Sequence, residues 1–171
     1  MPEISTGQAF RGHKVEECIL QLQAQWYVLE FCTVRFKPVF AFLDSLGVEW
    51  FCPVQINLRA RTGRMKSYTK VRSPLFPGYL FIRIDFNQLH TTAVTRHQYI
   101  RRFVSFGREP VPLDNDIIDS LRDEQNHDGE PSREVKFIDH EFTAILLIDD
   151  PLKRSLALLN YLASHNLRHA S

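Results

Sequence analysis

The chain of 171 residues lacks a long hydrophobic run and lacks the common catalytic motifs. A membrane-spanning helix needs about 18 consecutive apolar residues, and no run in this sequence approaches that length. The patterns G-x-S-x-G, H-E-x-x-H, G-x-x-x-x-G-K-[ST] and G-x-G-x-x-G are absent. The first 25 residues contain no secretory core. We therefore expect a cytoplasmic protein that does not span a membrane, is not an enzyme and uses no cofactor.

Cysteine is also scarce. The three cysteines, Cys18, Cys32 and Cys52, are odd in number, widely spaced and distant from any cluster of histidines. Structural zinc sites need ligands at short spacings such as C-x-x-C, so we expect no metal site. Cysteines of this kind behave as small buried hydrophobic residues in a reducing compartment.

Charge is distributed unevenly although the net charge is only +1. Residues 26–110 contain 13 basic and 5 acidic side chains, whereas residues 111–171 contain 6 basic and 12 acidic ones. This polarity indicates two units that have different partners or that attract each other. Thirteen phenylalanines are more than a core of this size needs, which leaves some for an apolar docking surface.

Residue types and periodicity predict alternating strands and helices in the front part of the chain. Short aromatic and β-branched runs predict strands, and apolar residues at helical spacing predict helices. The expected strands are 26–31, 48–58, 75–84 and 100–106, and the expected helices are 36–46, 87–96 and 114–124. The β-α-β-β-α-β order predicts an α+β sandwich with helices on one face of an antiparallel sheet.

Composition divides the chain into four segments. They are an N-terminal extension (1–25), a main domain (26–121), a polar linker (122–133) and a tail (134–171). Within the tail, residues 142–148 favour a strand by residue type, whereas 152–170 favour a helix. The helical pattern consists of Leu152, Leu156, Leu159 and Leu162. A tail this short seldom forms its own core, so we expect it to pack on the main domain.

Three landmarks resemble a known family. Trp26-Tyr27-Val28-Leu29, the L-F-P-G-Y-L-F run at 75–81 and the F-V-S-F-G run at 103–107 are similar to the N-terminal domain of the NusG family. The H-T-T motif at 90–92 resembles the specialised RfaH branch, plasmid-borne paralogues included, although position 93 is Ala where that motif has another Thr. The resemblance covers residues 26–121 well and 134–171 more weakly.

The resemblance implies a monomeric transcription elongation and antitermination factor. In this family the N-terminal domain bridges the β′ clamp and β of RNA polymerase, contacts the non-template DNA strand, and suppresses pausing and termination. The apolar patch for β′ would comprise Tyr27, Phe31, Phe51, Phe76, Pro77 and Tyr79, and His90, Thr91 and Thr92 would contact β. Because strand side chains alternate between two faces, a place in the core is the alternative for each aromatic residue.

Two groups of residues are candidates for nucleic-acid contact. A predicted basic β-hairpin at 59–72 has no acidic residue and contains Arg59, Arg61, Arg64, Lys66, Lys70 and Arg72. The second group contains Arg96, His97, Gln98, Arg101 and Arg102. Lys and Arg suffice for phosphate contacts, and Arg, His and Gln can also contact exposed bases; a solvated charged face is the alternative. Residues 32–42 are largely apolar, whereas RfaH carries residues that read its DNA element there. This departure from the RfaH pattern implies a different or relaxed DNA preference.

The tail departs furthest from the family pattern. It resembles the KOW-like C-terminal domain of RfaH, which masks the polymerase site as an α-helical hairpin and recruits the ribosome as a β-barrel. There is no glycine between Arg133 and Ala144, where a KOW turn needs one. Arg154 matches the basic partner of the interdomain ion pair, but the acidic position falls at Ser73. We therefore expect a weaker mask, held by apolar packing of Leu152, Leu156, Leu159 and Leu162 alone.

Two other functions fit the residues less well. A nucleic-acid enzyme would have to use Asp85, His90 and His97, and a metal-dependent cleavage assay would detect it. A general RNA-binding or ribosome-associated module would bind free RNA rather than polymerase.

Overall fold

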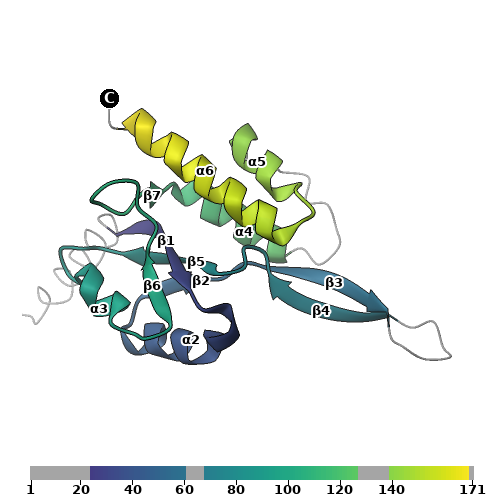
Figure 1. Cartoon of the computed structure of the whole chain (residues 1–171), viewed down its shortest axis with the longest axis horizontal. Coiled ribbons are helices and arrows are strands. Elements are labelled where there is room, and N and C mark those ends of the chain that lie inside the picture. Colours follow the sequence, from purple (N-terminus) through teal and green to yellow (C-terminus); the bar gives the residue numbers. More distant parts are fainter. Residues whose placement is uncertain (1–23, 61–67, 127–138, 170–171) are drawn as a thin grey trace, which may run out of the picture.

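The computed structural model describes residues 24–60, 68–126 and 139–169 (Figure 1). The strands are β1 (Gln25–Phe31), β2 (Glu49–Phe51), β3 (Val54–Ala60), β4 (Tyr68–Pro74), β5 (Tyr79–Ile84), β6 (Ile100–Phe103) and β7 (Pro112–Leu113). The helices are the 3-10 turn η1 (Thr33–Arg35), α2 (Phe36–Ser45), α3 (Thr91–Thr95), α4 (Asn115–Asn126), α5 (His140–Leu146) and α6 (Pro151–His169). The predicted extension, except for its last residues, and most of the predicted linker lie outside the described residues.

The central strand β1 organises an antiparallel sheet with the order β2-β5-β1-β6, and β7 also pairs with β1. The register between β1 and β5 is continuous from Gln25 opposite Ile84 to Glu30 opposite Tyr79. This mixed architecture of an antiparallel sheet with flanking helices confirms the predicted fold class.

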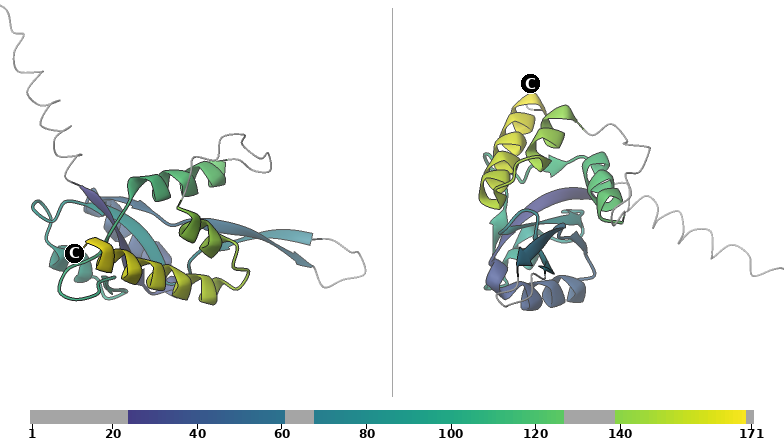
Figure 2. Two further views of the ribbon diagram at one scale, coloured as in Figure 1. Left: turned by 90° about the horizontal axis from the view of Figure 1, so that it is seen from above. Right: turned by 90° about the vertical axis from the view of Figure 1, so that its right-hand side faces the viewer.

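Alternate residues of β1 face two separate cores. Trp26 and Val28 belong to a tail-side core, which also contains residues of α4, α5 and α6. Tyr27 and Leu29 belong to an α2-side core, which also contains residues of α2 and α3. Figure 2 shows the two layers end-on, with α2 on one side of the sheet and α4, α5 and α6 on the other.

The expectation that helices cover only one face of the sheet was therefore wrong. β1 carries four consecutive buried side chains, Trp26 to Leu29, and β5 carries Leu80, Phe81 and Ile82 in succession. A strand that is apolar at successive positions is apolar on both faces and needs cover on both.

Several predicted elements have different bounds in the structure. The strand expected at 48–58 is divided into β2 and β3, because Pro53 has no N–H to give to a ladder. The strand expected at 75–84 begins at Tyr79, after Gly78 turns the chain with a φ of +87°. Helix α3 is shorter than predicted, since Asn87 bonds to the Asp85 carboxylate in a turn. Helix α4 runs to Asn126, into the range predicted as linker.

The described part of the tail is mostly helical, and residues 142–146 of the run that favours a strand by type belong to α5. Helix α5 begins after Asp139, whose carboxylate accepts the N–H of Glu141 at 3.1 Å. Helix α6 begins with Pro151, and the Asp150 carboxylate accepts the N–H groups of Leu152 and Lys153 at 2.9 Å each. Side-chain acceptors of this kind satisfy N–H groups that have no partner within the helix. The strand-favouring residues therefore adopt a helix because its caps are present and the sheet offers an apolar face to bury them.

Strands β3 and β4 form a separate two-stranded hairpin that projects from the rest of the molecule (Figure 1). Their pairing extends from Val54 opposite Pro74 to Ala60 opposite Tyr68. The described hairpin thus begins earlier than the predicted range 59–72, and the turn residues 61–67 lie outside the described chain. In the described ranges, no helix is both long and apolar enough to cross a membrane.

Candidate functional site

The sheet separates the six residues predicted to form one apolar patch. Tyr27 and Phe31, which are 8% and 3% exposed, lie in the α2-side core. Phe76 is buried in the tail-side core, and Phe51 and Tyr79 pack against it. Pro77 follows Phe76 on this same side and is half-buried. The structure therefore brings together four of the six, and the other two occupy the opposite face.

The tail helices cover this face. The rings of Phe76 and Phe142 lie 6.5 Å apart between centroids, and the Ser155 hydroxyl donates to the Pro77 carbonyl at 3.4 Å. Leu158 and Leu162, both fully buried, belong to the same core as Phe76. At roughly 1.5–3 kcal/mol for each large apolar side chain removed from water, this packing is the main force that holds the tail on the sheet.

The buried stripe of α6 differs from the predicted one. Leu162 is buried and Leu159 is half-buried, but Leu152 and Leu156 are 72% and 59% exposed. The side chains that face the sheet are Arg154, Ser155, Leu158, Tyr161 and Leu162. The leucine pattern was misleading because two polar residues, Arg154 and Ser155, occupy the first turn of the buried stripe. The prediction that Leu152 and Leu156 form the interdomain contact was wrong in this structure. They line the rim of a groove of about 510 Å³ beside Pro77 and Tyr79.

Arg154 is almost fully buried in the seam between tail and main domain, with 4% exposure. Its guanidinium donates to Gln55 Oε1 at 2.7 Å and to the Leu75 carbonyl at 3.0 Å, both on the main domain. It also donates to the Ile148 carbonyl within the tail, at 2.9 and 2.5 Å. The expectation that apolar packing alone holds the tail was therefore wrong.

A chain of hydrogen bonds leads from Arg154 through the neutral side chain of Gln55 to Ser73. Gln55 accepts from Arg154 and donates from Nε2 to the Ser73 hydroxyl at 3.3 Å. The Asn57 carboxamide also donates to Ser73, at 2.8 Å. Ser73 thus reaches Arg154 through Gln55 rather than directly. Sequence reasoning missed Gln55 because a neutral residue in a strand gives no charge signal.

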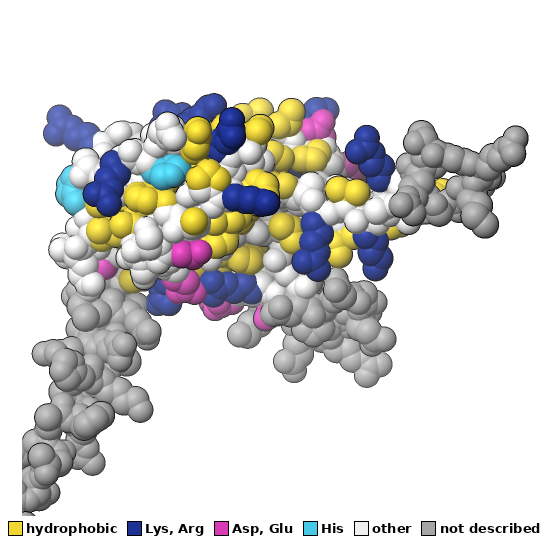
Figure 3. Space-filling model, turned by 90° about the horizontal axis from the view of Figure 1, so that it is seen from below, with side chains coloured by type: hydrophobic (Ala, Val, Ile, Leu, Met, Phe, Trp, Pro, Cys, Tyr) yellow, Lys and Arg dark blue, Asp and Glu magenta, His cyan; other side chains and the backbone are white. Residues whose placement is uncertain are grey.

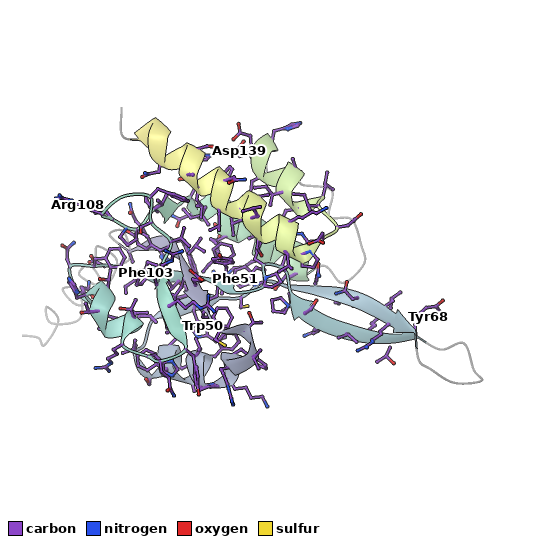
Figure 4. The ribbon with its side chains drawn as sticks, in the orientation of Figure 1. Trp50, Phe51, Tyr68, Phe103, Arg108 and Asp139 are labelled. Carbon is purple, nitrogen blue, oxygen red and sulfur yellow. The ribbon has the colours of Figure 1, made fainter. Side chains whose placement is uncertain are left out.

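A second polar cluster joins the N-terminus of α5 to the C-terminal half of α6. Asp139 (labelled in Figure 4) accepts the Tyr161 hydroxyl at 3.1 Å and lies 3.3 Å from His165 Nε2. Burial tends to raise the pKa of Asp139, but the N–H of Glu141, the Tyr161 hydroxyl and His165 outweigh it and hold that pKa below its usual value. Burial first, and then the neighbouring Asp139, raise the pKa of the Tyr161 phenol.

Asp139, Glu141 and His165 are the one group in the described ranges with enough metal-ligating atoms close together, within 4.8 Å. Asp139 already accepts hydrogen bonds through both carboxylate oxygens. The capping of α5 and the pairing of α5 with α6 therefore explain why these three side chains lie close together.

Burial raises the pKa of Cys52 to about 11, so its thiol stays protonated near neutral pH.

The H-T-T motif forms the N-terminus of α3. His90 is the N-cap, and its Nδ1 accepts the Thr92 N–H at 3.3 Å and lies 3.0 Å from the Thr92 hydroxyl. An accepting Nδ1 places the proton of the neutral ring on Nε2. His90 and Thr92 are exposed, and Thr91 is half-buried. The motif is therefore a fixed polar corner that can offer one ring N–H to a partner.

The second predicted nucleic-acid group lies on the α3–β6 segment. Arg101 and Arg102 both bind one carboxylate, that of Glu30, at 3.0 and 2.9 Å. Arg96 and Gln98 are exposed, and the half-buried ring of His97 packs on Phe42, 4.8 Å away between centroids. Sequence reasoning missed the aromatic members beside it, Phe42 and Tyr99, because both also fit a core pattern.

The hairpin carries its basic residues on two faces. Lys70 lies opposite Leu58 and Arg72 opposite Ile56, whereas Arg59 lies opposite Thr69 on the other face. Tyr68, at the far end of the described hairpin (Figure 4), is exposed. Arg61, Arg64 and Lys66 lie outside the described residues.

Gln55→Glu should strengthen the seam. The substitution gives Arg154 a charged acceptor, and charge-assisted hydrogen bonds are about twice as strong as neutral ones. We expect the free energy of unfolding to rise by about 1 kcal/mol, and Gln55→Ala to lower it by about the same amount. Urea unfolding of the full chain at pH 7 measures both; shifts in the same direction would show that this bond does not hold the seam.

Asp139→Asn should destabilise the tail helices in a pH-dependent way. Asn retains a cap for α5 but loses one acceptor, at a cost of about 1 kcal/mol at pH 7. Because the pKa of Asp139 is lower in the folded than in the unfolded chain, its contribution is present above the unfolded pKa and is lost as pH falls through the folded one. Urea midpoints of wild type and variant should therefore converge at acid pH; a constant gap contradicts the assignment.

A protein family and a solved structure match this chain. Residues 24–122 match the family model NusG, described as transcription termination factor nusG. The NusG structure from Thermotoga maritima, solved to study domain interaction in that protein, matches with 22% identity over 69% of this chain and 70% of that chain, and a TM-score of 0.41. The family match covers more than half of the sequence and the whole of the sheet. The chain belongs to the NusG family of transcription elongation and termination factors.

Proposed function

We propose that this protein is an antitermination factor of the RfaH branch that binds RNA polymerase in the cytoplasm. The observation that carries the proposal is the apolar face of Phe51, Phe76, Pro77 and Tyr79, which lies beneath a helical tail. A large apolar patch typically marks a docking site when it is exposed, and here the tail covers it. The monomer bridges β′ and β of the polymerase and thereby suppresses pausing and termination.

Each surface has its own partner in this proposal. The tail-side face receives the β′ clamp helices once α5 and α6 leave it. The polar corner at His90, Thr91 and Thr92 contacts β, and the α3–β6 segment with the basic hairpin contacts non-template and upstream DNA. Arg96 is exposed and forms no ion pair within the described residues, which supports the DNA contact.

The tail acts as a mask in this proposal. Opening it exposes Phe76 and costs the buried contacts of Leu158 and Leu162, so the closed state is favoured without a partner. A polymerase that binds the exposed face shifts the population toward the open state. The released KOW-like tail is then free to contact the ribosome.

Loosening the mask should increase polymerase affinity. Leu158→Ala removes a fully buried side chain from the seam, at a cost of about 2–4 kcal/mol. Leu156→Ala is the matched control, because Leu156 lies on the same helix but is exposed. Binding to labelled polymerase should be tighter for Leu158→Ala, tighter still on deletion of residues 130–171, and unchanged for the control. Equal affinity of all forms would show that the tail does not mask the site.

We expect the His90 ring to contact the polymerase directly, in addition to capping helix α3. His90→Ala removes both the ring and the cap, whereas His90→Asn keeps a capping side chain. We expect both variants to bind polymerase on the order of tenfold more weakly, as for a residue at the centre of an interface. Binding by His90→Asn at the wild-type level would limit the role of His90 to capping α3.

A general RNA-binding or ribosome-associated module is the alternative function. The projecting hairpin favours it, since Lys70 and Arg72 flank exposed Ile56 and Leu58 on one face. Binding to free RNA that is as tight as binding to polymerase would support this alternative.

A further inference from the structure

A cavity of about 450 Å³ lies between the tail and the main domain, where the described chain begins. Ala24, directly before β1, lines one side of it, and Tyr161 and Leu162 of α6 line another. Leu113 of β7 and Ile117 of α4 add apolar side chains to the wall. The start of β1, β7 and the C-terminal half of α6 lie at the same end of the molecule (Figure 1). The space is large enough for more than one apolar side chain.

The two halves of α6 are attached differently to the main domain. Near its beginning, the Arg154 guanidinium donates to Gln55 and to the Leu75 carbonyl. In the C-terminal half, Asn166 donates to the Phe106 carbonyl at 3.0 Å, whereas the Tyr161 hydroxyl bonds to Asp139 of the tail itself. Apolar side chains in the cavity would therefore add contacts to the main domain where α6 has few polar ones.

The sequence that leads into β1 alternates strictly between apolar and polar residues. The run 20–26 is Leu-Gln-Leu-Gln-Ala-Gln-Trp, so its apolar residues fall at even positions. In the structure Trp26 belongs to the tail-side core, and Ala24 lines the cavity on the same side. Because side chains of an extended chain alternate between two faces, the pattern predicts Leu22 and Leu20 on the tail side as well.

The distance along the chain is short. Leu22 precedes Ala24 by two residues, which corresponds to about 7 Å in an extended chain. Residues 1–23 lie outside the described chain, but Ala24 fixes the point from which they start. Leu22 therefore meets the cavity before it can reach any more distant surface, and Leu20 follows it on the same side.

We propose that Leu20 and Leu22 of the N-terminal extension pack into this cavity and hold the tail on the main domain. Burial of these two side chains against both units favours the closed arrangement, because opening would return them to water. The packing itself does not depend on the proposed function. Its consequence, a mask that opens less readily to the polymerase, rests on that function.

A second hollow, of about 550 Å³, also adjoins Ala24, but on the α2 side of the sheet. This side carries hydrophobic side chains interspersed with Lys, Arg and His (Figure 3). The Gln25 side chain accepts the Tyr27 hydroxyl, which belongs to the α2-side core, at 3.1 Å. The alternation continues from Gln25 to Gln23 and Gln21. Glutamines rather than leucines therefore face the second hollow, which favours the tail-side cavity for the leucines.

Amide hydrogen exchange of the full chain tests the proposal. The double variant Leu20→Ser/Leu22→Ser removes both apolar side chains, and Gln21→Ser/Gln23→Ser is the matched control in the same segment. We expect amides in the C-terminal half of α6 to exchange at least about tenfold faster in the leucine variant, since exposing a leucine shifts an opening equilibrium by roughly that factor. The control should exchange at the wild-type rate. Equal rates in both variants, or acceleration in α2 rather than in α6, would overturn the proposal.

Cross-linking locates the segment directly. In a chain whose three cysteines are replaced by serine, Leu22→Cys is combined with either Asn115→Cys or Gln88→Cys. Asn115 and Gln88 are exposed residues that line the cavity and the second hollow, respectively. Cysteine keeps a small apolar side chain at position 22. A short bismaleimide should join the Asn115→Cys pair several-fold faster; equal rates, or a faster reaction of the Gln88→Cys pair, would overturn the assignment to the cavity.

Polymerase binding, measured in parallel, separates this inference from the proposed function. If both hold, the leucine variant binds polymerase more tightly than the glutamine control. Unchanged exchange in α6 with normal polymerase binding would overturn the packing of the leucines alone. Faster exchange in α6 with no polymerase binding by any form would overturn the proposed function and leave the packing in place.

Discussion

The apolar character of the sheet on both faces is the constraint on which the other features of this protein depend. The strand pair β1 and β5 presents Tyr27 and Leu29 to one core and Trp26 and Val28 to the other. The first face is covered by α2 and α3, which adjoin it in the chain. The second face is covered partly by α4, and the remainder is left for the tail. The tail is too short to form a core of its own, and this face of the sheet needs cover. The tail and the sheet therefore stabilise each other.

The contact between the tail and the sheet combines extensive apolar packing with a smaller set of hydrogen bonds made by Arg154. Apolar burial around Phe142, Leu158 and Leu162 favours closure, but Arg154 must leave water to reach Gln55. Burying a guanidinium costs several kcal/mol unless its hydrogen bonds are satisfied, and here neutral oxygens satisfy them. The hydrogen bonds of Arg154 to Gln55 and to the Leu75 carbonyl thus fix the register in which the tail lies on the main domain.

Several parts of this structure followed from local sequence. The residue types of the run Trp26-Tyr27-Val28-Leu29 predicted a buried strand. The spacing of the apolar residues after Phe36 predicted α2. The prediction of a single covered face was wrong, because the successive apolar residues of β1 and β5 lie on both faces of the sheet and both faces need cover. The predicted patch was divided for the same reason: alternation in β1 sends Tyr27 and Phe31 to one side, whereas Phe76 and Tyr79 face the other.

The sequence by itself determined the family, the antiparallel α+β architecture and the basic character of the front domain, because motifs, periodicity and charge are properties of neighbouring residues. Only the tertiary structure decided that α6 buries Arg154 and Leu158 while exposing Leu152 and Leu156. It also decided that Arg35, Phe42 and Tyr99 join Arg96 and His97 in one row. These contacts join segments far apart in the chain, and their geometry depends on how both layers pack against the sheet.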